Sequence, residues 1–68
     1  MKMIGNETER FVVVTENGNH RVLDLQTNLY LQYGYNNPPL YADEQNCSVW
    51  GNYYSARGFC QTMMKKVS

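Results

Sequence analysis

The sequence predicts an α+β fold in which a three-stranded antiparallel sheet, a meander, packs on one C-terminal helix. Two observations carry this prediction. The pair Asn17-Gly18 lies between two β-rich runs, which is a strong hairpin signal. Near the C-terminus, apolar residues recur at alternating gaps of four and three, the spacing of one buried helix face. These residues are Val49, Tyr53, Ala56, Cys60, Met63 and Val67.

The chain is expected to form a single small domain over residues 1–68, because 68 residues suffice for one small core. Residues 1–8 mix polar and small side chains without periodicity and are expected to be a flexible leader. The three-stranded sheet is expected over 10–34 and a connecting loop over 35–41. That loop contains Pro38 and Pro39, which cannot donate hydrogen bonds to a strand ladder.

The hairpin signal also predicts a register. A first strand over 10–16 turns at Asn17-Gly18 and returns over 19–26. After a second turn signal at Thr27-Asn28, residues 29–33 are expected to form the third strand, which ends near Gly34. The predicted cross-strand pairs are Val12 with Leu23, Val13 with Val22 and Val14 with Arg21.

The helix is expected over residues 43–66. Asp43 and Glu44 place negative charge at its first turn, and Lys65 and Lys66 place positive charge at its last, which matches the helix dipole. The segment 48–58 has poor helix propensity, however. An alternative therefore makes 48–54 and 59–66 two strands of a small five-stranded barrel. The uninterrupted spacing of three and four favours the helix.

Charge and motifs exclude most catalytic classes. Six Lys and Arg balance six Asp and Glu, so no global field favours nucleic acid or an anionic membrane. The glycines form no phosphate-binding pattern, and Cys47 and Cys60 lack the neighbouring ligands of a zinc site. Both cysteines are expected to be buried, reduced thiols, and His20 an ordinary strand residue. We expect a non-enzymatic chain with no catalytic residues, no metal and no cofactor.

The N-terminus lacks the apolar stretch of a secretory signal. The longest apolar run, Phe11 to Val14, is far shorter than a membrane span. A cytoplasmic location and no membrane partner are therefore expected.

A function follows from the predicted architecture. One helix can cover only one face of a sheet, so apolar side chains on the other face need a partner. We expect a protein-binding module that acts by stoichiometric occlusion or scaffolding, either as a dimer or on a larger host complex. The short chain, rich in Asn and Tyr, is similar in make-up to accessory proteins of phages and mobile elements, including inhibitors of host defence. The expected interface residues are Phe11, Val13, Val22, Leu31, Tyr33, Trp50 and Tyr54.

The alternative function is nucleic-acid binding. The order of elements resembles that of small DNA-binding domains of the plant AP2 type and of some phage integrase arm-binding regions. That resemblance implies a sheet that enters the major groove, with Arg10, His20, Arg21 and Tyr30 as the contacting residues. The zero net charge disfavours this alternative, because phosphate contacts normally need cationic side chains.

Overall fold

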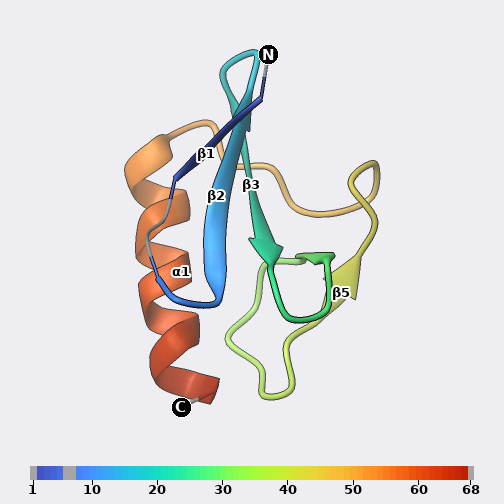
Figure 1. The fold of residues 1–68 in the computed structure, drawn as a ribbon, viewed down its shortest axis with the longest axis vertical. Coiled ribbons are helices and arrows are strands. Elements are labelled where there is room, and N and C mark those ends of the chain that lie inside the picture. Colours follow the sequence, from blue (N-terminus) through green and yellow to red (C-terminus); the bar gives the residue numbers. More distant parts are fainter. Residues whose placement is uncertain (1, 6–7, 68) are drawn as a thin grey trace.

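The computed structural model describes residues 2–5 and 8–67. It is an α+β fold in which five antiparallel strands form an open sheet in sequence order, followed by one C-terminal helix (Figure 1). The elements are β1 (Met3–Gly5), β2 (Phe11–Glu16), β3 (Asn19–Asp24), β4 (Leu29–Leu31), β5 (Tyr41–Ala42) and α1 (Tyr53–Val67). The predicted class is confirmed, with five strands in place of three. Because β1 and β5 lie at opposite ends of the strand order, the sheet does not close into the alternative barrel.

The central hairpin forms as predicted. Asn17 and Gly18 both have positive φ, at 53° and 77°, which is the backbone conformation of a tight two-residue hairpin turn. All three predicted pairs between β2 and β3 are present. The second turn is also confirmed, because Asn28 has a φ of 59° and its N–H donates to the carbonyl of Asp24 at 2.8 Å.

The expected flexible leader is wrong for residues 3–5, which form β1. Met3 pairs with Thr15 and Ile4 with Val14. The side chains of Met3 and Ile4 are 67% and 60% exposed, so backbone pairing rather than burial holds the strand. This explains why hydrophobic patterning gives no signal for it. Residues 1, 6 and 7 of the predicted leader lie outside the described residues.

The helix begins ten residues later than predicted, at Tyr53 rather than 43. Its N-cap is Asn52, whose Oδ1 accepts hydrogen bonds from the N–H groups of Tyr54 (2.8 Å) and Ser55 (3.3 Å). Asp43 instead caps a separate turn, where its carboxylate accepts from the N–H of Asn46 at 2.9 Å. Acidic side chains suit a turn as well as a helix start, and the poor helix propensity of 48–52 decides between the two.

The helix covers the sheet face that was expected to stay open. Phe11, Val13 and Val22 are each 0% exposed beneath α1, as is Leu31, so their expected position on an uncovered face is wrong. Both faces of the hairpin are apolar, and the alternation of side chains does not specify which face takes the helix. The helix contributes Ala56, Phe59, Cys60 and Met63 to this core.

The opposite face is also covered, by the segment that follows β5. Val12 and Val14 lie on this face and are 0% and 3% exposed, and Cys47 is 8% exposed. The segment is fixed over the sheet through Glu44: Arg21 Nε donates to its carbonyl at 3.1 Å and the Tyr30 hydroxyl donates to its carboxylate at 2.9 Å. One chain therefore covers both faces of its own sheet with a helix and an ordered loop.

Candidate functional site

One partly exposed apolar feature is a group of aromatic rings that we call the aromatic surface, formed by Tyr33, Tyr35, Trp50 and Phe59. Phe59 is 2% exposed and forms its floor. The centroid of the Phe59 ring lies 4.9 Å from that of Trp50, 5.5 Å from Tyr35 and 5.9 Å from Tyr33. Tyr33 stacks on Phe59 with an interplanar angle of 29° and meets Tyr35 edge-on at 5.6 Å. These separations are those of favourable aromatic pairs.

The loop between β4 and β5 holds the two tyrosines in place. The N–H of Tyr33 donates to the Ser48 hydroxyl at 2.7 Å, and the N–H of Gln32 donates to the carbonyl of Leu40 at 2.8 Å. Farther along, the side-chain amide of Asn37 donates to the carbonyl of Lys66 near the end of α1, at 3.0 Å. Hydrogen bonds thus join the loop to Ser48 and to the end of α1.

Gly34, between the two tyrosines, allows the turn that brings both rings onto Phe59. Its φ is +145°, a backbone conformation that residues with a Cβ rarely adopt. A Cβ at this position would also lie 2.7 Å from the side-chain nitrogen of Asn36. The glycine is therefore part of what builds the aromatic surface.

Two of the four rings of the aromatic surface are exposed to solvent. Tyr33 is 61% exposed and Tyr35 is 45% exposed, although both rings are packed against Phe59. A side-chain hydrogen bond with Tyr33, together with burial, raises the pKa of Tyr35 above its ordinary value. None of the four rings carries a formal charge. Uncharged, exposed aromatic side chains of this kind are enriched in the energetic centres of protein interfaces.

The predicted interface residues divide into three groups. Tyr33 and Trp50 lie together on the aromatic surface. Tyr54 is 73% exposed but lies in the first turn of α1, where its ring contacts Tyr53 at 5.6 Å. The remaining four are the core residues described above.

Sequence reasoning missed two members of the aromatic surface. Phe59 lies three residues after Ala56 and four before Met63, so the helical spacing that identified those residues could have included it. Tyr35 follows Tyr33 at a spacing of two, but the turn at Gly34 breaks the strand pattern that would have linked the two rings.

The residues expected to contact nucleic acid are engaged within the chain. Arg10 pairs with Asp24, and Arg21 and Tyr30 are bound to Glu44. His20 exchanges two backbone hydrogen bonds with Trp50, and its Nδ1 lies 2.8 Å from the Thr15 hydroxyl. Because a loop covers one sheet face and α1 the other, the described residues offer no open sheet to a major groove.

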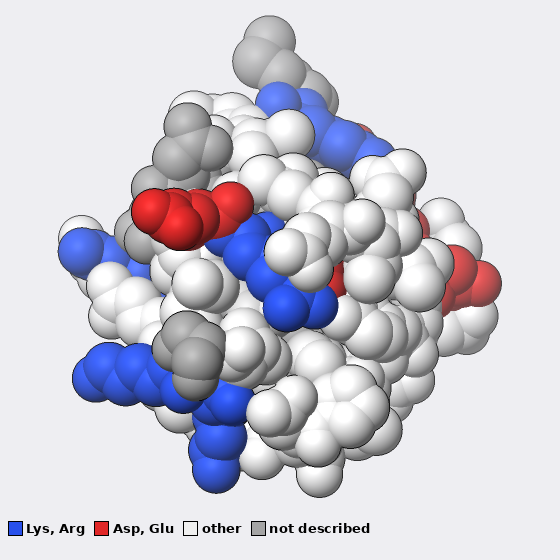
Figure 2. Space-filling view, turned by 60° about the horizontal axis from the view of Figure 1, so that its bottom comes forward, with Lys and Arg blue, Asp and Glu red and all other residues white. Residues whose placement is uncertain are grey.

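Charges are scattered over the surface. Figure 2 shows, on one face of the molecule, two basic side chains next to each other at the lower left, and other Lys and Arg side chains separated by acidic side chains or by uncharged areas. In the part of the chain that the structure describes, this face carries no continuous basic patch. Such a patch is the usual electrostatic feature of a nucleic-acid-binding protein.

Asp24 is a fully buried carboxylate held by three hydrogen-bonding groups. Arg10 binds it through Nε at 3.0 Å and through the terminal nitrogen at 2.8 Å, and the Tyr41 hydroxyl donates to the same carboxylate. Burial acts to raise the pKa of Asp24, but hydrogen bonds from Arg10, from Tyr41 and from the backbone of Gln26 outweigh it and lower the pKa. The arrangement stabilises a charge inside the fold and exposes no reactive atom.

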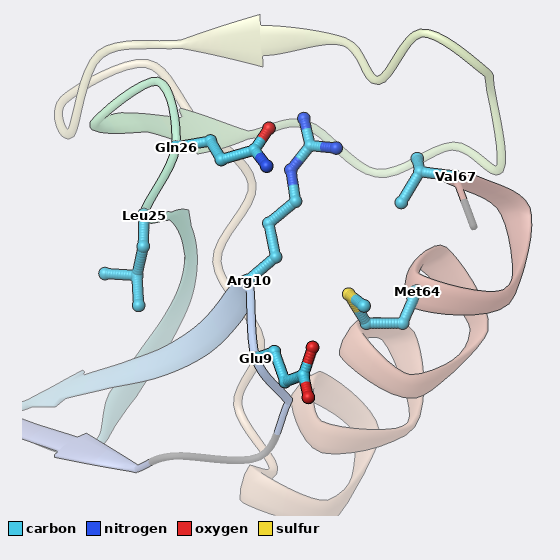
Figure 3. Close-up of a pocket in the computed structure, with 6 residues that line it drawn as sticks. All are labelled: Glu9, Arg10, Leu25, Gln26, Met64 and Val67. Atoms are coloured by element: carbon cyan, nitrogen blue, oxygen red, sulfur yellow. The ribbon is translucent and has the colours of Figure 1, made fainter.

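A depression of about 370 Å³ lies beside this pair. In Figure 3 the guanidinium of Arg10 points into the space between the loop and the end of α1, and the Gln26 amide lies beside it. The lining residues are Glu9, Arg10, Leu25, Gln26, Met64 and Val67. They include no hydroxyl, thiol or imidazole group, so the depression offers no nucleophile paired with a base.

The two cysteines lie in different parts of the fold, Cys47 in the loop before α1 and Cys60 in α1. Cys47 and Cys60 are both buried and form no disulfide, and burial raises the pKa of Cys47. Among residues 2–5 and 8–67, no three His, Cys, Asp or Glu side chains are grouped as metal ligands would be. In the same ranges there is no helix with the length and apolar character that a membrane span needs.

Comparisons of this chain with protein-family models, with curated proteins and with solved structures give no match.

Proposed function

We propose that this chain is a small protein-binding module that acts by stoichiometric occlusion or scaffolding and binds its partner through the aromatic surface. One observation carries the proposal: Tyr33 and Tyr35 stay 61% and 45% exposed while their rings are packed against the buried Phe59. Packing of this kind within the core would be ordinary. At the surface it places a large apolar area in water, which a bound protein would remove.

The fixed positions of the rings favour binding. A side chain that is ordered before association loses less conformational entropy when the complex forms. Tyr33 is ordered by its stacking on Phe59 and by the backbone hydrogen bond to Ser48, and Tyr35 by its contacts with both rings. Tyrosine and tryptophan are also the side chains that most often dominate the binding energy of an interface.

The chemistry of the aromatic surface indicates the type of partner. Because the four rings are uncharged and the chain has no net charge, affinity would come from shape and apolar contact. We therefore expect a protein with an apolar groove or pocket, and an affinity that changes little with salt. A molecule of 30 × 21 × 18 Å that docks in this way would act by covering part of a larger complex, as an inhibitor from a phage or mobile element does.

The proposal is tested by capture from a lysate of the source organism on the immobilised chain, followed by mass spectrometry. The double variant Tyr33→Ser/Tyr35→Ser should retain about one tenth or less of the partner captured by the wild type, because interface tyrosines of this kind contribute about 2 kcal/mol. The matched control is Tyr54→Ser, which removes a tyrosine that is 73% exposed but lies outside the aromatic surface. The control should capture as much as the wild type.

Circular dichroism should show that both variants keep the wild-type fold. Equal capture by the wild type and the double variant would contradict the proposed site. Loss of capture in Tyr54→Ser alone would show that the interface lies at the first turn of α1. A parallel mobility-shift assay at low salt should show no binding to single- or double-stranded nucleic acid, and a salt-sensitive shift would favour the alternative function.

A further inference from the structure

The depression beside the Arg10–Asp24 pair has the size and the mixed lining of a site for a small ligand. Its volume of about 370 Å³ lies in the range of pockets that hold small molecules. Three segments that are distant in sequence meet there: the residues before β2, the turn after β3 and the last turn of α1. The described lining residues include no ring of the aromatic surface, so a ligand here would bind independently of the protein partner proposed above.

The guanidinium of Arg10 is held in place at this depression, with one nitrogen left over. Nε and one terminal nitrogen, Nη2, donate to the Asp24 carboxylate, and Nη2 also donates to the Tyr41 hydroxyl at 3.1 Å. These bonds do not use the other terminal nitrogen, Nη1, and the side chain is 21% exposed. Figure 3 shows the guanidinium directed into the depression. Arg10 therefore offers a hydrogen-bond donor that is already ordered before a ligand arrives.

Glu9 gives the depression a net negative charge. Its carboxylate forms no hydrogen bond or ion pair with another residue that the structure describes, whereas the charge of Arg10 is neutralised by Asp24. Figure 3 shows the Glu9 carboxylate and the Arg10 guanidinium at opposite ends of the group of lining side chains. A cationic group of a ligand is therefore favoured near Glu9, and an uncharged acceptor near Arg10.

Apolar side chains line the two remaining sides. In Figure 3, Leu25 lies on one side of the depression, and Met64 and Val67 of α1 lie on the other. Leu25 is 51% exposed, and Met64 and Val67 are partly buried against the core. The N–H of Gln26 donates to the Asp24 carboxylate at 2.9 Å and so fixes the turn that carries Leu25 and Gln26. An apolar group of a ligand has ordered walls to pack against.

We propose that this depression binds an α-ammonium group followed by a carbonyl group, with an apolar side chain between them. This is the chemistry of the first residue of a polypeptide and of an amino acid amide. The Glu9 carboxylate accepts hydrogen bonds from the ammonium group, Nη1 of Arg10 donates to the carbonyl oxygen, and the apolar side chain packs on the apolar walls. A carboxylate in place of the carbonyl group suits the site less, because Glu9 repels it.

The test is an NMR titration of the full chain with three probes: leucinamide, N-acetyl-leucinamide and the peptide Leu-Ala-Gly-amide. Leucinamide should bind with a Kd of about 1 mM and shift the backbone amide signals of Glu9, Gln26 and Met64. The acetylated probe should bind about tenfold more weakly, because it has no ammonium group to pair with Glu9. Tighter binding of the peptide than of leucinamide would identify a polypeptide as the source of the ligand, and equal binding an amino acid amide.

Two variants with the same substitution locate the site. Glu9→Gln should weaken the binding of leucinamide about tenfold, because it removes the charge that pairs with the ammonium group. Glu16→Gln is the matched control, because Glu16 lies at the other end of β2, and it should bind leucinamide as the wild type does. The double variant Tyr33→Ser/Tyr35→Ser should also bind leucinamide normally. Circular dichroism checks that each variant keeps the wild-type fold.

Several results would overturn the proposal. One is equal binding of leucinamide and its acetylated form, and another is no saturable binding at about 20 mM of either free amine. Equal affinities of the wild type and Glu9→Gln for leucinamide would have the same meaning. Added salt should weaken the binding of leucinamide, because it screens an exposed ion pair, and an affinity that is independent of salt would also contradict the proposed contacts.

Discussion

Asp24 shows how a single residue can determine the pH range in which this fold is stable. Its carboxylate is completely buried, and hydrogen bonds from Arg10 and from the Tyr41 hydroxyl stabilise its negative charge. Removing Arg10 would leave the Asp24 charge buried and unpaired, and removing Asp24 leaves the half-buried Arg10 without its acceptor; either change costs more than the pair itself contributes. The sequence places Asp24 opposite Phe11 in the hairpin, on the face that α1 covers, but it does not show that Arg10 lies close enough to compensate the charge.

We predict that Asp24→Asn lowers the free energy of unfolding at pH 7 by about 3 kcal/mol. The pKa of Asp24 is lowered in the folded state, so its stabilising effect is present above the unfolded pKa of about 4 and is lost as the pH falls through the folded pKa. The difference between wild type and variant, measured by urea unfolding at several pH values, should therefore shrink below pH ~4.

Tyr41→Phe is the milder companion variant, because it removes only the hydroxyl that donates to Asp24. We expect a smaller loss at pH 7, of about 1–2 kcal/mol. A difference between wild type and Asp24→Asn that is the same at pH 3 and pH 7 would show that the Asp24 charge does not contribute as described.

Among the elements, those with local signals were predictable. The turn at Asn17-Gly18 requires positive φ and fixes the register of β2 and β3, and the helical spacing identified the core side of α1 through Ala56, Cys60 and Met63. β1 and β5 were missed because long-range backbone pairing positions them, while their own side chains are exposed or half-buried. No local pattern encodes such pairing.

The start of α1 is the boundary that sequence reasoning misplaced, and it can be tested directly. Asn52 caps the helix through two hydrogen bonds to backbone N–H groups. We predict that Asn52→Ala lowers the free energy of unfolding by about 1 kcal/mol, whereas Asn52→Asp stays close to the wild type. A helix that began at residue 43 would place position 52 in its interior. There Ala would be the better residue, and an increase in stability would contradict the observed boundary.

The candidate site was only partly predictable for the same physical reason. Tyr33 and Trp50 were expected at an interface from their side-chain type alone. Their convergence on Phe59 needs the turn at Gly34 and the hydrogen bond from Tyr33 to Ser48, which join distant segments. The four predicted residues of the sheet were misassigned because α1 packs on the face that was expected to stay open and buries them.

The molecule as a whole encloses two small layers of core around one sheet. A helix covers one face, and the loop that contains Glu44 and Cys47 covers the other, within a radius of gyration of 10.5 Å. The large apolar side chains that remain exposed include Tyr33 and Tyr35 of the aromatic surface, Met3 and Ile4 of β1, and others such as Leu25, Val49 and Tyr54. We propose that the chain binds its partner through the aromatic surface, and not through a sheet face.

The most direct test of this claim is hydroxyl-radical footprinting of the six tyrosines, first in the free chain and then in its complex with the captured partner. In the free chain, Tyr33, Tyr35 and Tyr54 should be the most oxidised, because they are 61%, 45% and 73% exposed. In the complex, Tyr33 and Tyr35 should become protected while Tyr54 stays reactive. Protection of Tyr54 with Tyr33 and Tyr35 still oxidised would contradict the account.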